Sequence, residues 1–195
     1  MNKQLAALLA ISVSAATLQG CAGLLIGGAA TGAAVAHDQR TAGTVLEDES
    51  IEIKAFHALR EDRVLDAQSH FNVTSYNNIV LLTGETASQE LRERAGKLVA
   101  DVEKVRSVHN ELKIGEPSTL LARSADSVIT TEVKASLFNV NGIDHFDPTR
   151  VKVVTEAKVV YLMGLLKHAE ADAVTETVRQ VSGVERVVKI FEYVD

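Results

Sequence analysis

Two stretches, Ile79-Val80-Leu81-Leu82-Thr83-Gly84 and Val159-Val160-Tyr161-Leu162-Met163-Gly164, decide the fold of this 195-residue chain. Each is rich in β-branched and leucine side chains and ends on a glycine, a pattern typical of a β-strand. A second extended run precedes each stretch, at residues 71–76 and 151–155. The intervening Asn77-Asn78 suits a two-residue turn, because asparagine tolerates positive φ. Each copy therefore contains a β-hairpin, with Gly84 and Gly164 as equivalent structural glycines at its end.

Helical periodicity surrounds each hairpin. Ile51, Ala55 and Leu59 recur every four residues before the first hairpin, and Ile129, Val133 and Leu137 do so before the second. This spacing predicts one buried helix face. Second helices are expected after the hairpins, at residues 88–102 and 168–181. Their apolar rows are Leu91, Ala95, Leu98 and Val102 in the first copy, and Ala171, Val174, Val178 and Val181 in the second.

A final short strand closes each copy, at residues 105–114 and 184–193. The matching elements stand 78 residues apart at Ile51 and Ile129 and 80 apart at the two glycines, so the chain is an internal repeat. The predicted fold class is α+β, with two tandem αββαβ domains, each a small mixed three-stranded sheet with two helices on one face. How the two copies pack on one another is left open by the sequence.

The N-terminus carries a lipoprotein signal. Lys3 gives a cationic start, an apolar segment follows, and Leu18-Gln19-Gly20-Cys21 ends it with a small residue before the only cysteine. Cys21 is therefore expected to carry a diacylglycerol and an acyl chain, which together anchor the protein firmly. The alternative is a free or buried cysteine behind an ordinary signal peptide. Because no second cysteine exists, an intramolecular disulfide is excluded.

Small apolar residues fill positions 22–36, too few to span a bilayer as a helix. We interpret them as a Gly/Ala-rich tether, with one uncleaved anchor over residues 4–36 as the alternative. The predicted organisation is a signal peptide, a lipidated tether, a first domain, a linker and a second domain. These cover residues 1–20, 21–46, 47–115, 116–123 and 124–195.

The net charge and the motifs of the sequence argue against several classes of function. A formal charge of −6 argues against nucleic acid as a partner. The chain has no GxSxG elbow, no phosphate loop and no HExxH pair, so catalysis and metal binding are not expected. Asp144-His145-x-Asp147 is the nearest approach to a ligand cluster, and we interpret it as a solvated turn. Residues 66–70 are interpreted as a polar loop.

This order of elements resembles the dual BON-domain outer-membrane lipoproteins. The resemblance rests on residues 38–48, on Ile129-Thr130-Thr131-Glu132-Val133-Lys134 and on Val181-Ser182-Gly183-Val184-Glu185-Arg186-Val187, and it covers essentially the whole chain. Ala22 after the cysteine is similar to sorting signals for the outer membrane. The implied location is the outer membrane, lipid-anchored and facing the periplasm, with no cofactor beyond the lipid on Cys21.

The resemblance also implies non-catalytic binding of membrane phospholipid and support of envelope integrity. The implied contact is the first helix of the second domain, at residues 124–140. Its candidate lipid-binding residues lie off the core row: Ser127, Val128, Thr131, Lys134, Ala135 and Phe138. Phe138 could instead close the core or the domain interface.

The charges on this helix do not favour binding to anionic lipid over neutral lipid. Arg123 and Lys134 are balanced on this helix by Asp126 and Glu132, so any such preference would come from cations near the hairpin. These are Arg150, Lys152 and Lys158. The alternative function is a protein-interaction adaptor for an envelope assembly or peptidoglycan-remodelling partner.

Overall fold

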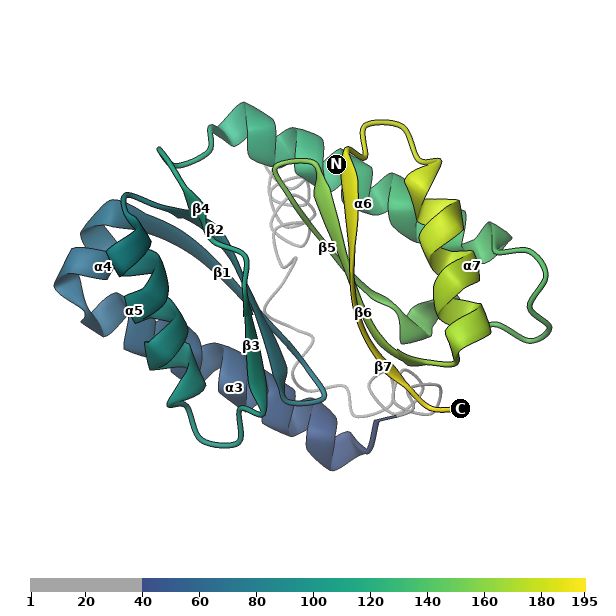
Figure 1. Cartoon of the computed structure of the whole chain (residues 1–195), viewed down its shortest axis with the longest axis horizontal. Helices are drawn as coiled ribbons and strands as arrows, with labels where there is room; N and C mark the ends of the chain where they lie inside the picture. Colours follow the sequence, from purple (N-terminus) through teal and green to yellow (C-terminus); the bar gives the residue numbers. More distant parts are fainter. Residues whose placement is uncertain (1–39) are drawn as a thin grey trace, which may run out of the picture. The chain divides into compact units, whose positions relative to one another are not determined.

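The computed structural model describes residues 40–195, which contain both copies of the repeat (Figure 1). The first copy consists of α3 (Ala42–Glu61), α4 (Arg63–Gln68), β1 (Ser69–Tyr76), β2 (Ile79–Thr86), α5 (Gln89–Ala100), β3 (Ser107–Asn110) and β4 (Lys113–Ile114). The second consists of α6 (Leu120–Ser136), the 3-10 turns η2 (Leu137–Asn139) and η3 (Pro148–Arg150), β5 (Lys152–Glu156), β6 (Val159–Leu166), α7 (His168–Arg179) and β7 (Arg186–Tyr193). The α+β prediction of two αββαβ units is confirmed.

Each sheet is mixed. β1 and β5 pair antiparallel with the central strands β2 and β6, and the last strand of each copy pairs parallel on the other side. In the first copy that last strand is divided into β3 and β4, both paired with β2. Leu112, between them, is 2% exposed and belongs to the core below the helices.

Helices α3 and α5 begin at side-chain caps that the sequence carries. The Thr41 hydroxyl accepts from the Thr44 amide at the start of α3, and the Ser88 hydroxyl accepts from the Leu91 amide at the start of α5. The predicted core rows are buried: Ile51, Ala55 and Leu59 are 2%, 0% and 0% exposed. Equivalent burial holds for Ile129, Val133 and Leu137, at 6%, 0% and 1%.

The prediction of a polar loop at residues 66–70 is wrong. Residues up to Gln68 lie in the short helix α4, and β1 starts at Ser69. The Asp62 carboxylate accepts from the amides of Val64 and Leu65, which starts this helix, and Leu65 is fully buried. One buried leucine in six residues is too short a signal for helical periodicity.

A buried aspartate supports each hairpin turn. The Asp48 carboxylate on α3 accepts hydrogen bonds from the backbone N–H groups of Asn77 and Asn78, at 2.8 Å each. Both asparagines have positive φ. Asp126 on α6 accepts in the same way from Ala157 and Lys158, also at 2.8 Å. Because Ala157 and Lys158 have φ of 47° and 61° without being glycine or asparagine, that turn depends on the carboxylate.

Gly84 and Gly164 lie inside β2 and β6, each two residues before the last residue of its strand. A Cβ on Gly84 would stand 2.0 Å from the His70 carbonyl oxygen, and its φ of +120° is unfavourable for other residues. A Cβ on Gly164 would stand 2.8 Å from the Arg150 carbonyl oxygen. Both glycines permit a close approach of the neighbouring backbone.

The central strands are buried on both faces. Val80 and Leu82 point into the core beneath the first pair of helices, whereas Leu81 belongs to a third cluster shared by both sheets. The buried members of that shared cluster are Tyr76, Leu81, Val159, Tyr161, Met163 and Ile190. The two sheets therefore pack face to face, with α3, α4 and α5 outside one and α6 and α7 outside the other (Figure 1).

Polar groups rim this shared apolar cluster. The Asn72 amide donates to the Glu156 carboxylate at 2.7 Å, and the Lys152 ammonium lies 2.9 Å from the Glu52 carboxylate. Within the cluster, burial is the main cause that raises the pKa of Tyr161 to about 12. The interface is therefore an apolar centre with a polar edge, like that of a stable protein complex.

Candidate functional site

The outward face of α6 is the candidate site. Its core row points inward, and all six predicted lipid-binding residues are exposed: Ser127, Val128, Thr131, Lys134, Ala135 and Phe138. Val128 is 57% exposed and Phe138 is 74% exposed. The alternative in which Phe138 closes the core or the domain interface is therefore wrong. Two large apolar side chains are therefore exposed to solvent, Val128 on α6 and Phe138 in the η2 turn that follows it.

Two further leucines extend this face and were missed in the sequence. The helix starts at Leu120, not at residue 124, and Leu120 and Leu121 are 80% and 82% exposed. The Thr119 hydroxyl accepts from the Ala122 amide and so caps the helix. A threonine before Leu-Leu is a start signal that could have found them. We call Leu120, Leu121, Val128 and Phe138 the α6 apolar set.

The hydroxyl groups on this face are already hydrogen-bonded within the helix. Ser124 donates to the Leu120 carbonyl at 2.9 Å, Ser127 to the Arg123 carbonyl at 3.0 Å, and Thr131 to the Ser127 carbonyl at 3.0 Å. Moving a hydroxyl out of water costs less free energy when it already donates to an acceptor within the helix than when it is unpaired. The polar residues between the apolar ones therefore add little to the cost of entering an apolar medium.

The charge balance of the helix differs from that expected. Asp126 is 5% exposed and faces the hairpin turn, so its charge is withdrawn from the outward face. Lys134 and Glu132 are exposed and Arg123 is half-buried. The exposed surface of α6 is thus mildly cationic, whereas the sequence predicted a neutral helix.

The three cations near the hairpin each have a carboxylate partner. Arg150 lies 3.0 Å from Glu170, and its side chain is 12% exposed. Lys158 pairs with Glu185 at 2.9 Å, and Lys152 pairs with Glu52. The charge of each of these three cations is therefore balanced by a carboxylate in contact with it.

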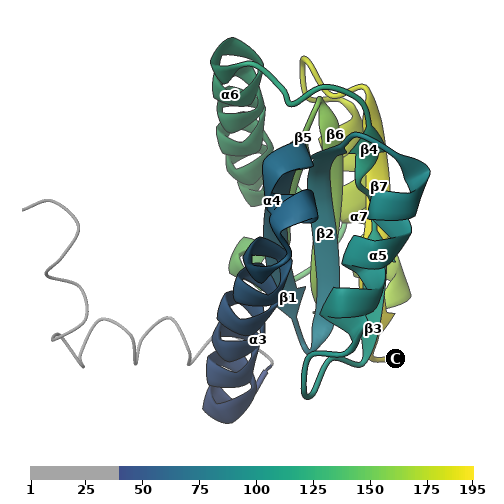
Figure 2. The ribbon, with the colours of Figure 1, turned by 90° about the vertical axis from the view of Figure 1, so that its left-hand side faces the viewer.

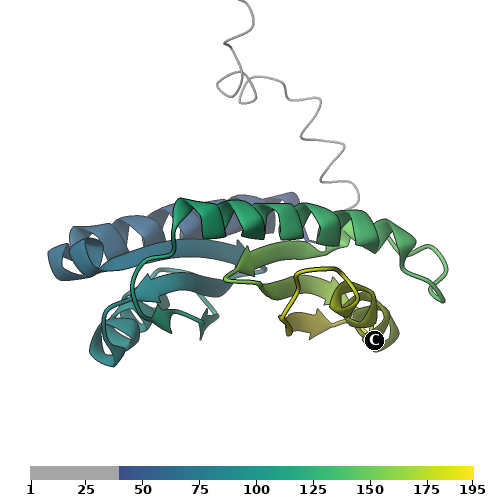
Figure 3. The same cartoon turned by 90° about the horizontal axis from the view of Figure 1, so that it is seen from above.

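The first helix of the other domain lies on the same side of the molecule. Figures 2 and 3, at right angles to one another, both place α3 and α6 on one side of the two sheets. On α3, Leu46 and Ile53 are 67% and 61% exposed. This side therefore carries exposed apolar residues from both domains, of which α6 has the larger share.

Residues 40–195 contain neither a metal-binding cluster nor a membrane-spanning helix. No group of three or more histidine, cysteine, aspartate or glutamate side chains there could hold a metal ion. Among those same residues no helix has the length and apolar content to cross a bilayer. Asp147, from the loop interpreted as a solvated turn, accepts from the Thr149 amide and so starts η3.

Comparison with known proteins identifies the class. The BON domain profile matches residues 47–116 and 125–195, one match to each copy of the repeat. The chain belongs to the BON domain family, and members of this kind are non-catalytic. The resemblance drawn from the sequence is confirmed.

Among its relatives, the chain is 38% identical over 193 residues to the outer membrane lipoprotein DolP of Haemophilus influenzae, covering 99% of this chain and 97% of the relative. It is 38% identical over 157 residues to a 21 kDa hemolysin of Actinobacillus pleuropneumoniae, covering 80% and 79%. It is 30% identical over 149 residues to the osmotically-inducible protein Y of Escherichia coli, covering 74% and 72%. The predicted signal peptide, Cys21 and most of the predicted tether lie outside the described residues. Helix α3 begins at Ala42, within the range predicted for the tether.

Proposed function

We propose that this chain is an outer-membrane lipoprotein, anchored through Cys21 and facing the periplasm, that docks reversibly on phospholipid through α6 and supports envelope integrity. The observation that carries the docking is the α6 apolar set, whose side chains are exposed by 57–82% on α6 and on the η2 turn that follows it. Large exposed apolar side chains on one face mark an interaction surface. The similarity to DolP over nearly the whole chain supports the location.

Docking would add a weak contact to a strong anchor. Once Cys21 fixes the chain to the bilayer, α6 meets lipid at a high effective concentration, so a weak helix contact suffices. A helix with exposed Leu, Val and Phe lies in the plane of the interface, where its apolar side chains leave water. Lys134 can extend its ammonium toward the headgroups from the same face.

Vesicle binding by residues 37–195, which form one compact unit, tests this proposal. Leu121→Ser and Val128→Ser should each weaken binding about tenfold, because burying such a side chain is worth about 1.5 kcal/mol or more. The matched control is Ile53→Ser, an equally exposed residue on α3. Equal binding by all four proteins would refute docking through α6.

A protein-interaction adaptor predicts a different outcome in cells. With a photocrosslinking residue at position 128, lipid docking should give adducts with phospholipid. A dominant protein adduct at that position would instead support the adaptor.

A further inference from the structure

The first domain has an apolar groove of its own, between α3 and β1, which pack against one another (Figure 2). Its volume is about 350 Å³. Its apolar lining residues are Ile53 and Phe56 on α3, and Phe71 and Val73 on β1. Glu52, His57 and Asn72 complete the lining. Ile53 is 61% exposed and Phe56 is 39% exposed, so the helix side of the groove is open to solvent.

β1 forms one edge of its sheet, because β2 is the only strand of the described residues that pairs with it. In an antiparallel pair, the main-chain N–H and C=O groups of alternate residues point toward the partner strand and away from it. Ser75 belongs to the set that points away. Its N–H donates to the Glu52 carboxylate at 2.8 Å, and its carbonyl accepts from the Lys152 ammonium at 3.3 Å. The turn end of this edge is therefore already hydrogen-bonded.

Phe71 and Val73 belong to the same alternating set, so their main-chain groups also point away from β2. Within residues 40–195, no hydrogen bond outside the strand pairing involves these groups. Both side chains pack against the core of the first domain, which places the unpaired main chain beside the groove. Unpaired N–H and C=O groups on a sheet edge are a template for another strand.

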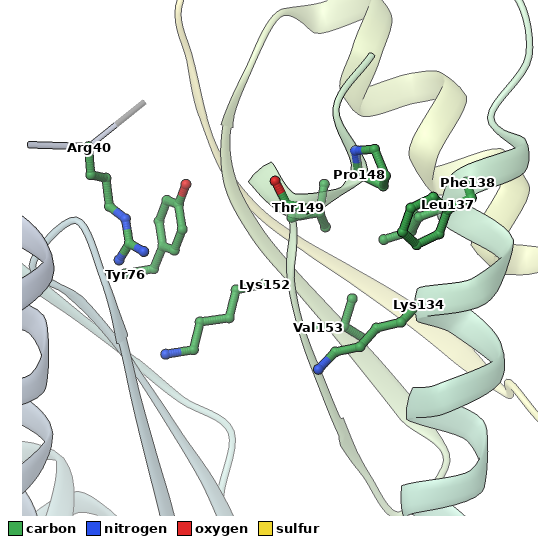
Figure 4. Close-up of a pocket in the computed structure, with 10 residues that line it drawn as sticks. Arg40, Tyr76, Lys134, Leu137, Phe138, Pro148, Thr149, Lys152 and Val153 are labelled. Carbon is green, nitrogen blue, oxygen red and sulfur yellow. The ribbon is translucent and has the colours of Figure 1, made fainter. Parts of the chain in front are cut away.

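The second domain does not repeat this groove. Its corresponding edge strand is β5, and at the 78-residue spacing Thr131 replaces Ile53 and Lys134 replaces Phe56. Lys134 and Val153 line a cleft at that place (Figure 4). An edge strand bordered by exposed apolar residues of the neighbouring helix is therefore a feature of the first domain.

The occupant that fits both features is an extended polypeptide segment. Its main chain offers donors and acceptors in the spacing that a sheet edge requires, whereas the acyl chain of a lipid offers neither. Successive side chains of a strand point to opposite faces. One set would lie between Ile53 and Phe56, and the other would lie toward His70 and Asn72. That second side is polar, since the Asn72 amide donates to Glu156 at 2.7 Å.

We propose that the first domain binds an extended segment of another protein by strand addition to β1. The segment alternates apolar and polar residues, hydrogen-bonds to the main chain of Phe71 and Val73, and places its apolar side chains against Ile53 and Phe56. This goes beyond the proposed function, because it gives the first domain a protein partner and requires neither α6 nor lipid.

Peptides in solution test the strand addition directly. We would titrate ¹⁵N-labelled residues 37–195 with a pool of short blocked peptides in which valine, leucine, isoleucine or phenylalanine alternates with serine or lysine. Saturable shifts and slower hydrogen exchange are expected at the Phe71 and Val73 amides, because strand addition provides the acceptors that they lack. The control pool has the same side chains and a methyl group on every main-chain nitrogen, and it should not bind.

Substitutions in the groove identify the site. Ile53→Ser and Phe56→Ser should each weaken peptide binding about tenfold, because burying an apolar side chain of this size is worth about that factor. The matched control is Val128→Ser, at a similarly exposed position on α6, which should bind peptide like the parent. Vesicle binding should show the opposite order, with Val128→Ser weakened and Ile53→Ser unchanged.

Each contrary result overturns a definite part of the proposal. No shift at Phe71 or Val73 would overturn it, and vesicle binding that depends on Val128 would still stand. Equal binding by the methylated pool would make the groove a simple apolar pocket and overturn strand addition. Equal shifts from monomeric dihexanoyl-phosphatidylglycerol would assign the groove to lipid. A dimer in sedimentation that Ile53→Ser dissociates would make a second copy of this chain the occupant.

Discussion

Leu81 and Leu82 are neighbours on β2, both 0% exposed, and they point into different cores. Leu82 lies beneath the helices of its own domain, whereas Leu81 is buried by the sheet of the other copy. If the two sheets pack face to face, Leu81→Ala and Leu82→Ala should cost similar free energies of unfolding, about 2.7–5 kcal/mol each. For a protein of this size, that corresponds to a fall in Tm of roughly 5–20 °C.

Urea unfolding of residues 37–195 at pH 7, followed by far-UV circular dichroism, measures both values. Without sheet packing, Leu81 would face solvent, and surface substitutions usually change stability by less than about 0.5 kcal/mol. A Leu81→Ala protein as stable as the parent, beside a destabilised Leu82→Ala protein, would refute the packing.

A double-mutant cycle sharpens this test. Leu81 and Tyr161 belong to the shared cluster but come from different domains. Leu81→Ala and Tyr161→Leu should therefore be non-additive by about 0.5–3 kcal/mol. Leu82→Ala combined with Tyr161→Leu should add within about 0.5 kcal/mol.

Three further predictions concern buried groups. Asp126→Ala should destabilise the protein by about 1.5–3 kcal/mol in urea unfolding, because the turn amides lose a charged acceptor, and Asp126→Asn should cost less. Gly84→Ala should cost roughly 2–6 kcal/mol from backbone strain and overlap, whereas Gly115→Ala, with nothing within 4 Å of its Cβ, should be nearly neutral by the same measurement. Burial raises the pKa of Glu156 above 4.5, so its contribution to stability is complete at pH below 4.5 and lost as pH rises through the folded-state value. Glu156→Gln should therefore be more stable than the parent at pH 7 and equal to it near pH 4; an unchanged difference across that range would contradict this.

Much of the fold could be predicted because its signals are local. Four-residue spacing identified the buried rows of α3 and α6, and Asn77-Asn78 identified a hairpin turn. The packing of the two sheets on one another was not predicted, although the sequence of β6 indicates it. Every residue of Val159–Leu166 except Gly164 is apolar, and a strand apolar on both faces needs both faces covered. What covers the second face is set by contacts between residues distant in sequence, which no local pattern specifies.

The candidate site was predictable in its position and less so in its charge. The exposure of the six candidate residues, five on α6 and Phe138 in η2, follows from helical spacing. The inward turn of Asp126 does not, because it depends on a hairpin some thirty residues later whose amides need an acceptor. Asp48 stands three residues before Ile51 as Asp126 stands before Ile129, so the repeat itself carried this signal.

The repeat also allows the outward faces of α3 and α6 to be compared residue by residue. Aligning α3 with α6 at the 78-residue spacing keeps the inward positions alike and changes the outward ones. Leu46, Ile53 and Phe56 correspond to Ser124, Thr131 and Lys134, whereas Ser50 and Arg60 correspond to Val128 and Phe138. An outward face used only for solubility would have no reason to exchange apolar for polar residues in both directions at these five positions. The inward rows meet the same packing demand in both domains, so they stay alike, and the outward rows meet different surroundings. The two first helices therefore serve different contacts, and a variant of α3 is a control for α6 rather than a second copy of its function.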